Sequence, residues 1–203
     1  MNTSFDRPLL NRKIFPNLVI VGSTASGKST VAYQLAKILG FGIIDLDAWI
    51  EQKQGRPITE IFASEGEEGF RALETATIRS LGSLLNHIII PGGGALESDE
   101  NWALLRQLGP SIWLATPQSE VVFRLLKNPE EVKKRPLLLP ALDIADPLQR
   151  REYLESRLNE LDERRLRRYK EADYAVTISF ATAGTCAQFI KEILLLRQTP
   201  QNM

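Results

Sequence analysis

Residues 18–30 of this chain read LVIVGSTASGKST, a short apolar run followed by a loop that carries two glycines. The apolar run is mostly β-branched, as expected of a strand that is buried on both faces of a parallel sheet. Behind the loop, apolar residues recur at helical spacing from Ser29 to Leu39, and Gly40 stands where a helix commonly ends. The stretch therefore predicts a strand, a loop and a helix in succession.

The loop satisfies the pattern G-x-x-x-x-G-K-[ST], which is typical of phosphate-binding loops between a strand and a helix. Backbone N–H groups of such a loop bind phosphate oxygens, Lys28 reaches the β- and γ-phosphates, and the Ser29 hydroxyl can ligate Mg²⁺. The alternative is a glycine turn with an incidental lysine, but the flanking strand and helix favour the phosphate loop. The predicted ATP-binding residues of the loop are Gly22, Ala25, Ser26, Gly27, Lys28, Ser29 and Thr30.

Strand-like and helical patterns alternate along the rest of the chain. Further strands are expected at 42–47, 87–90, 111–115 and 174–179. A long charged helix is expected from an Asp146 cap to about residue 172, and a last helix at about 184–197. The segment 57–85 is expected to form helices that are broken near Gly66. Such alternation is typical of an α/β protein with a parallel sheet and helices on both faces. We therefore predict a three-layer α/β/α fold.

Composition narrows the class of protein. The length of 203 residues suits one compact domain, which we place at 17–198 behind a flexible arm at 1–16. Lys+Arg and Asp+Glu both count 25, so no net charge attracts nucleic acid or an anionic membrane. A single cysteine forms no internal disulfide, and no apolar run is long enough to span a bilayer. We expect a cytoplasmic monomer that binds neither nucleic acid nor membranes.

Two carboxylates, Asp45 and Asp47, come at the expected end of the second strand, the edge where open α/β sheets bind ligands. Residues two apart on a strand share a face, so both side chains are expected to point the same way. One could hold Mg²⁺ through its water shell, and the other could orient or deprotonate a substrate hydroxyl. Alternatively, Asp47 caps a helix that starts at Ala48, and the two roles are compatible.

The run Gly92-Gly93-Gly94 follows the third expected strand, with Pro91 between them. Three glycines cost backbone entropy and fit a place where a ligand approaches the main chain, although a tight turn is an alternative. Arg135 lies in a charged, proline-rich segment, where a mobile cation could close over a phosphate. Arg71 precedes Glu74 by three residues in a helical pattern, and its position alone indicates only a surface ion pair.

Taken in order, these residues resemble the shikimate kinase family of P-loop kinases, which share a nucleoside-monophosphate-kinase-like fold and phosphorylate the 3-hydroxyl of shikimate with ATP. The resemblance covers about 17–179. Besides the phosphate loop it is carried by Ile44-Asp45-Leu46-Asp47 with Ile50-Glu51, Gly55, Ile58, Ile61-Phe62, Gly66-Glu67, Phe70-Arg71 with Glu74, the triple glycine, Arg135-Pro136-Leu137-Leu138, Arg165 with Tyr169, and Ala172-Asp173. It implies the strand order 2-3-1-4-5, a substrate-binding part at about 48–82 and a lid at about 128–148.

The resemblance also implies roles for single residues. Shikimate would be bound by Asp47, Arg71, Gly92, Gly93, Gly94 and Arg165. Lys28, Asp47 and Arg135 would be catalytic, with Arg135 at the phosphates. Asp45 would order Mg²⁺ through water beside Ser29, and Arg124 would pack on the adenine of ATP. The anionic carboxylate of shikimate suits paired guanidinium groups.

The chain departs from the family pattern at three places. Ala25 stands where the family usually has glycine. The stretch from Arg135 to Tyr169 is longer than usual, with the extra length at about 139–151. Leu166-Arg167-Arg168 replaces a proline-containing approach to Tyr169, and 179–182 replace the usual polar turn after the last strand, so Arg164 or Arg168 could take the place of Arg165. These departures leave two alternatives open beside shikimate phosphorylation in aromatic amino acid (chorismate) biosynthesis. One is a kinase for another small polyol acid, such as gluconate or an aminoshikimate-like compound, and the other is a non-catalytic nucleotide-binding homologue.

Overall fold

The computed structural model of the chain describes residues 16–133, 135–177 and 182–196. Its strands are β1 (Asn17–Val21), β2 (Gly42–Asp45), β3 (His87–Ile90), β4 (Ser111–Ala115) and β5 (Tyr174–Thr177). Its α-helices are α1 (Lys28–Leu39), α2 (Leu46–Gln54), α3 (Ile58–Ser80), α4 (Asp99–Leu108), α5 (Gln118–Lys127), α6 (Pro129–Lys133), α7 (Pro147–Lys170) and α8 (Ala183–Leu196). Short 3₁₀ helices are η1 (Leu81–Ser83), η2 (Gly93–Glu97) and η3 (Pro136–Leu142).

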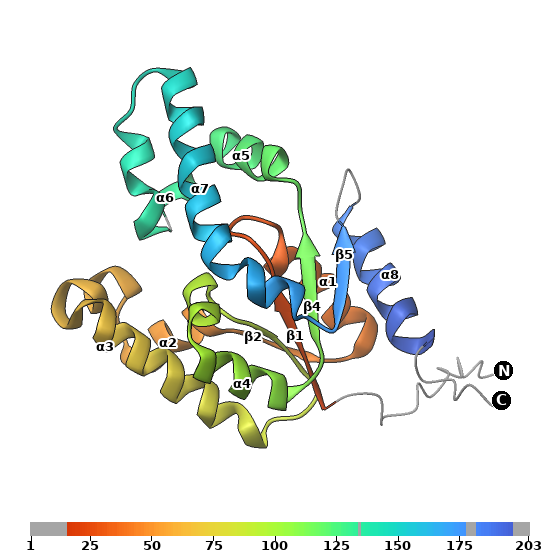
Figure 1. Cartoon of the computed structure of the whole chain (residues 1–203). Coiled ribbons are helices and arrows are strands. Elements are labelled where there is room, and N and C mark those ends of the chain that lie inside the picture. The colour runs from red at the N-terminus through yellow and green to blue at the C-terminus, as the bar shows by residue number, and fades with distance from the viewer. Residues whose placement is uncertain (1–15, 134, 178–181, 197–203) are drawn as a thin grey trace, which may run out of the picture.

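The sheet has five parallel strands in the order β2-β3-β1-β4-β5 (Figure 1), which confirms the predicted fold and strand order. β1 lies in the middle and pairs with β3 on one side and β4 on the other. Of the fifth predicted strand, Ile178 and Ser179 lie outside the described residues, as do the expected N-terminal arm up to residue 15 and Arg197 of the last helix.

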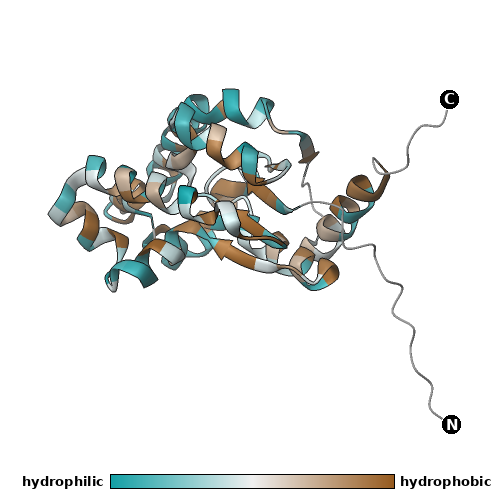
Figure 2. Cartoon of the chain, turned by 90° about the horizontal axis from the view of Figure 1, so that it is seen from below, coloured by the Kyte–Doolittle hydropathy of each residue, from teal (hydrophilic) through white to brown (hydrophobic). Residues whose placement is uncertain are grey.

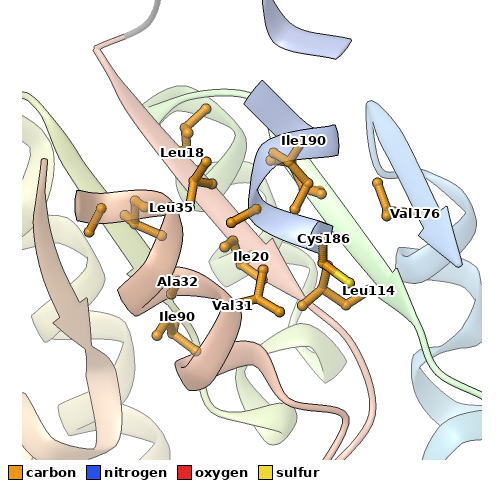
Figure 3. Close-up of a cluster of buried hydrophobic side chains, with 14 of the residues drawn as sticks. Leu18, Ile20, Val31, Ala32, Leu35, Ile90, Leu114, Val176, Cys186 and Ile190 are labelled. Atoms are coloured by element: carbon orange, nitrogen blue, oxygen red, sulfur yellow. The ribbon is translucent and has the colours of Figure 1, made fainter. Parts of the chain in front are cut away.

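Helices cover both faces of the sheet because successive side chains of a strand point in opposite directions. Leu18 and Ile20 of β1 pack with α1 and α8 on one face, where Figure 3 shows their buried side chains beside Ile190. Val19 and Val21 pack on the other face, with residues of α3, α4 and the end of α7. Figure 2 shows the strands as predominantly hydrophobic and much of the surrounding helices as hydrophilic.

Two helical segments flank the sheet, and Figure 1 shows one at the left of the molecule and the other at the top. The first contains α2 and α3, and α3 is broken at Gly66, whose φ of 71° is left-handed. This confirms the predicted break. The second contains α5, α6, η3 and α7, which share a small apolar cluster of their own that includes Val121, Leu138 and Leu158. The extra length at 139–151 therefore forms the end of η3, a turn and the start of α7.

The second strand is shorter than predicted. β2 ends at Asp45, and Leu46 already begins α2, so the expectation that Asp45 and Asp47 share one face of a strand is wrong. The reason lies in the neighbouring strand: Asp45 pairs with Ile90, and Pro91, which follows Ile90, has no N–H group to continue the ladder. Asp47 lies in the first turn of α2, and Asp45 occupies the N-cap position without a capping hydrogen bond from its side chain.

No helix in the described ranges is both long and apolar enough to cross a membrane.

Two helix ends are capped by the residues that the sequence indicated. Gly40 caps α1 in the left-handed conformation, and the Asp146 side chain caps α7 by accepting a hydrogen bond from the Gln149 N–H at 2.8 Å.

Candidate active site

The phosphate loop runs from the end of β1 to the start of α1. Lys28 Nζ donates hydrogen bonds to two carbonyl oxygens of the loop, that of Gly22 at 3.0 Å and that of Ser23 at 2.8 Å. The lysine therefore lies along the inside of the loop, as a phosphate-binding lysine does. Ala25 has a φ of 57°, in the left-handed region that favours glycine.

Burial and the nearby positive charges of Arg135 and Arg165 together lower the pKa of Lys28 to about 8, although Asp47 and Asp45 oppose the shift. A buried ammonium group that lies near two guanidinium groups lacks sufficient negative charge around it. A bound polyphosphate would supply that charge. The electrostatics of the loop therefore suit an anionic ligand.

A pair of oxygen atoms suitable for a divalent cation lies at the start of α1. The Ser29 hydroxyl donates a hydrogen bond to Asp45 Oδ2 at 3.3 Å, and both residues line the same cavity. Hydroxyl and carboxylate oxygens are the ligands that Mg²⁺ prefers, usually with several waters retained. The residues present therefore fit a magnesium ion beside the phosphate loop.

One cavity of about 1270 Å³ connects the phosphate loop to the glycine run that follows β3. With the exception of Gly22, it is lined by every site residue expected from the sequence: Ala25, Ser26, Gly27, Lys28, Ser29, Thr30, Asp45, Asp47, Arg71, Gly92, Gly93, Gly94, Arg124, Arg135 and Arg165. Gly22 opens the loop against β4, where a Cβ atom would lie 2.7 Å from the Leu114 carbonyl oxygen. Residues from seven parts of the chain thus meet in one space.

Each residue of the glycine run makes room for a different side chain of the cavity. A Cβ atom on Gly92 would lie 2.6 Å from Asp47 Oδ1, one on Gly93 would overlap the Arg165 guanidinium, and one on Gly94 would overlap that of Arg71. These side chains come from α2, α7 and α3. The run also begins η2, which confirms the turn, and the approach of a ligand to the main chain stays a prediction.

Two carboxylates lie beside this run with raised pKa values. Burial, helped by the Asp45 charge, raises the pKa of Asp47 to about 6. Burial raises the pKa of Glu74 to about 7, although Arg71 opposes the shift. Glu74 is completely buried, and its Oε2 accepts a hydrogen bond from Arg71 Nη1 at 3.0 Å while its Oε1 has no partner among the described residues. The Arg71–Glu74 pair is therefore part of the cavity wall, and the surface-pair interpretation is wrong.

Of the three candidate arginines late in α7, only Arg165 lines the cavity. Its side chain is 3% exposed, and Nε and Nη2 donate to Glu97 Oε1 at 3.0 and 2.9 Å. Arg168 is bound instead by Asp99 and by Glu171. Arg164 is exposed.

The two arginines from the other side of the cavity are also held by the protein. Arg124 Nη1 donates to the carbonyl oxygen of Ser26 at 3.0 Å, so its guanidinium lies against the phosphate loop. Arg135, at the start of η3, pairs with Glu131 at 2.9 Å. Arg124 therefore lies at the phosphate-loop end of the cavity, and Arg135 lines the same cavity, while their contacts with ATP stay predictions.

A sequence model described as shikimate kinase matches residues 24–194, most of the chain. The chain belongs to the shikimate kinase family. Curated shikimate kinases are similar over nearly the whole length. That of Prochlorococcus marinus (strain MIT 9313) is 37% identical over 196 residues, covering 96% of this chain and 94% of the relative, and that of Synechococcus sp. (strain RCC307) is 41% identical over 192 residues, covering 95% and 91%.

A solved structure of the family has the same fold. Shikimate kinase from Acinetobacter baumannii, determined in complex with shikimate, superimposes with a TM-score of 0.78 at 33% identity, covering 91% of this chain and 95% of the other. Like the kinases of its family, this chain is an ATP-dependent phosphotransferase.

Two acidic residues beside the site were given no role there by the sequence analysis, Glu74 and Glu97. Glu74 follows Arg71 by three residues, which is equally typical of an exposed pair, so its burial was not visible in the sequence. Glu97 is 68 positions away from Arg165, its partner, and no local pattern connects them. A carboxylate close behind the glycine run was the only available signal.

Proposed function

We propose that this chain transfers the γ-phosphoryl group of ATP to the 3-hydroxyl of shikimate, giving shikimate 3-phosphate and ADP, a step of aromatic amino acid biosynthesis. The observation that carries the proposal is the single cavity in which the phosphate loop and the Asp47, Arg71 and Arg165 side chains meet. Family membership supports the same substrate.

The nucleotide would bind at the phosphate loop. Backbone N–H groups of residues 22–30 and the N-terminus of α1 would hold the β- and γ-phosphates, with Lys28 beside them. Arg124, fixed against the loop, would pack on the adenine. Ser29, and Asp45 through water, would hold Mg²⁺, which would supply positive charge beside the phosphates.

Shikimate would bind at the glycine run. Its carboxylate would accept hydrogen bonds from Arg71 and Arg165, since planar guanidinium groups match the geometry of a carboxylate. Asp47 would accept hydrogen bonds from the ring hydroxyls. The absence of side chains at Gly92, Gly93 and Gly94 would let Asp47, Arg165 and Arg71 lie beside the main chain and reach the ring.

In the reaction, the 3-hydroxyl oxygen attacks the γ-phosphorus in line, and the bond between that phosphorus and the oxygen bridging to the β-phosphate breaks. Asp47 orients the hydroxyl and takes its proton. With a pKa of about 6, this carboxylate is mostly ionised at neutral pH and stronger as a base than an exposed aspartate. Lys28 and Arg135 stabilise the charge that develops on the transferred group and on ADP.

The proposal extends to the parts of the chain around the cavity. The segment of about 48–82 would bind shikimate, and that of about 128–148, with Arg135, would close over the phosphates as a lid within a single kinase domain at 17–198. We place the enzyme in the cytoplasm as a monomer.

Release of ADP, measured in a coupled assay with ATP and Mg²⁺, tests the proposal. Shikimate should raise ADP release far above the rate without an acceptor, and ³¹P NMR should identify shikimate 3-phosphate. Gluconate and an aminoshikimate serve as competing acceptors. If either supports the higher kcat/KM, or if ADP release stays at background with shikimate, the proposed substrate is wrong.

A further inference from the structure

One carboxylate oxygen of Glu97 binds the Arg165 guanidinium. Glu97 Oε1 accepts hydrogen bonds from both Nε, at 3.0 Å, and Nη2, at 2.9 Å. Glu97 ends η2, three residues after the glycine run, and it does not line the described part of the cavity, whereas Arg165 does. The acid therefore touches the arginine without facing the proposed substrate.

Glu97 and the nearby Tyr169 hydroxyl do not use all the donors of the guanidinium, and the remaining donors are available to a ligand. A guanidinium offers five N–H donors in a fixed plane, and a carboxylate can bind either at its Nε–Nη2 side or at its Nη1–Nη2 end. Glu97 occupies the Nε–Nη2 side. Nη1 lies against Gly93, at the place where a Cβ atom would otherwise be. The Nη1–Nη2 end of the Arg165 guanidinium is therefore the end available to an anionic ligand in the cavity.

A second acid, Asp162, also interacts electrostatically with Arg165. Asp162 lies one turn earlier on α7, and the charge of Arg165 lowers its pKa against the raising effect of burial. A guanidinium released from Glu97 could turn toward Asp162 and lose its alignment with the glycine run. The hydrogen bonds from Glu97 oppose that movement.

We propose that Glu97 is a positioning residue for the substrate carboxylate: it holds Arg165 so that the Nη1–Nη2 end faces the cavity beside Gly93. The inference rests on the proposed function, because it takes the bound substrate to be a carboxylate. In this inference Glu97 affects how the substrate carboxylate binds and takes no part in the phosphoryl transfer itself.

Two conservative variants separate the geometry of Glu97 from its charge. Glu97→Gln keeps an oxygen at the same reach that can accept both hydrogen bonds, so its KM for shikimate should stay at or below that of the wild type. Glu97→Asp keeps the charge but is one methylene shorter, so its KM for shikimate should rise about tenfold, the loss expected when a charge-assisted contact is misaligned. In both variants kcat and the KM for ATP should stay within about twofold of the wild type.

A matched control and an uncharged substrate complete the experiment. Glu100→Asp makes the same change at an exposed acid of α4 that pairs with Arg79, and its KM values should equal those of the wild type. Shikimate methyl ester lacks the anionic carboxylate, so Glu97→Asp should not raise its KM.

The outcomes separate the inference from the proposed function. A wild-type enzyme with no shikimate-dependent ADP release would remove the proposed function. An active wild type would instead overturn the role of Glu97 if Glu97→Asp left the KM for shikimate unchanged, raised the KM of the ester or of ATP equally, or behaved like Glu97→Gln.

Discussion

The carboxylate of Asp47 lies against the main chain of Gly92 so closely that a Cβ atom on Gly92 would be 2.6 Å from Asp47 Oδ1. The same atom would be 3.1 Å from Glu74 Oε1. Backbone on one side and two buried acids on the other leave no space for a methyl group. The position of the proposed catalytic carboxylate therefore depends on a residue without a side chain.

Gly92→Ala should displace Asp47 and lower kcat/KM for shikimate by at least about tenfold, because small misplacements of a reacting group are costly. Steady-state kinetics measure this loss. Gly82→Ala is the control, since a Cβ atom on Gly82 would meet no other atom within 4 Å. Equal activity of the two variants would show that Asp47 does not need this space.

Asp47→Asn should lower kcat by about 10²–10⁴-fold, the range typical for loss of a general base. The amide keeps the size of the side chain but takes no proton. Nucleotide binding, measured by calorimetry with ADP and Mg²⁺, should remain, because the phosphate loop is unchanged. A variant with the wild-type kcat would remove Asp47 from the mechanism.

The same variant should be more stable than the wild type at neutral pH. The pKa of Asp47 rises from 3.8 to about 6 on folding, so the folded state binds the proton more tightly and ionisation opposes folding. The gain from Asn should be absent below about pH 4 and should grow to about 1–3 kcal/mol above about pH 7. Urea unfolding of the ligand-free proteins across this pH range measures it, and a gain that is largest at acid pH would contradict the shift.

Arg71→Ala should raise the KM for shikimate about 10–100-fold, the cost of losing hydrogen bonds to a charged group. ATP affinity should not change, since Arg71 lies at the glycine run. Arg79→Ala is a matched control on the same helix, because Arg79 is exposed and pairs with Glu100. A parallel loss of ATP and shikimate binding would indicate general misfolding instead.

Ala25 should tolerate glycine better than valine. Its φ of 57° is costly for any residue with a side chain, so Ala25→Gly relieves strain of about 1 kcal/mol and loses a similar amount of backbone entropy. Ala25→Val places a β-branched residue there and should destabilise the protein by about 1–3 kcal/mol. Thermal unfolding and kcat compare the two, and equal stability of both would contradict the left-handed conformation.

Local patterns predicted most of the fold. Strands buried on both faces appear as continuous apolar runs, and the break of α3 at Gly66 and the cap of α7 at Asp146 depend on neighbouring residues alone. The end of β2 was missed because it depends on a partner strand, where Pro91 stops the ladder. Residues distant in sequence controlled that boundary.

By itself, the sequence determined the phosphate loop, the alternation of strands and helices and the residues that carry the family resemblance, because each depends on the identity and spacing of near neighbours. Only the tertiary structure decided that Glu74 is buried beneath Arg71, that Arg165 rather than Arg164 or Arg168 reaches the cavity, and that Glu97 holds it. The physical reason is that burial and ion pairing depend on which segments meet in space, and a carboxylate in the sequence looks the same whether it faces water or a guanidinium.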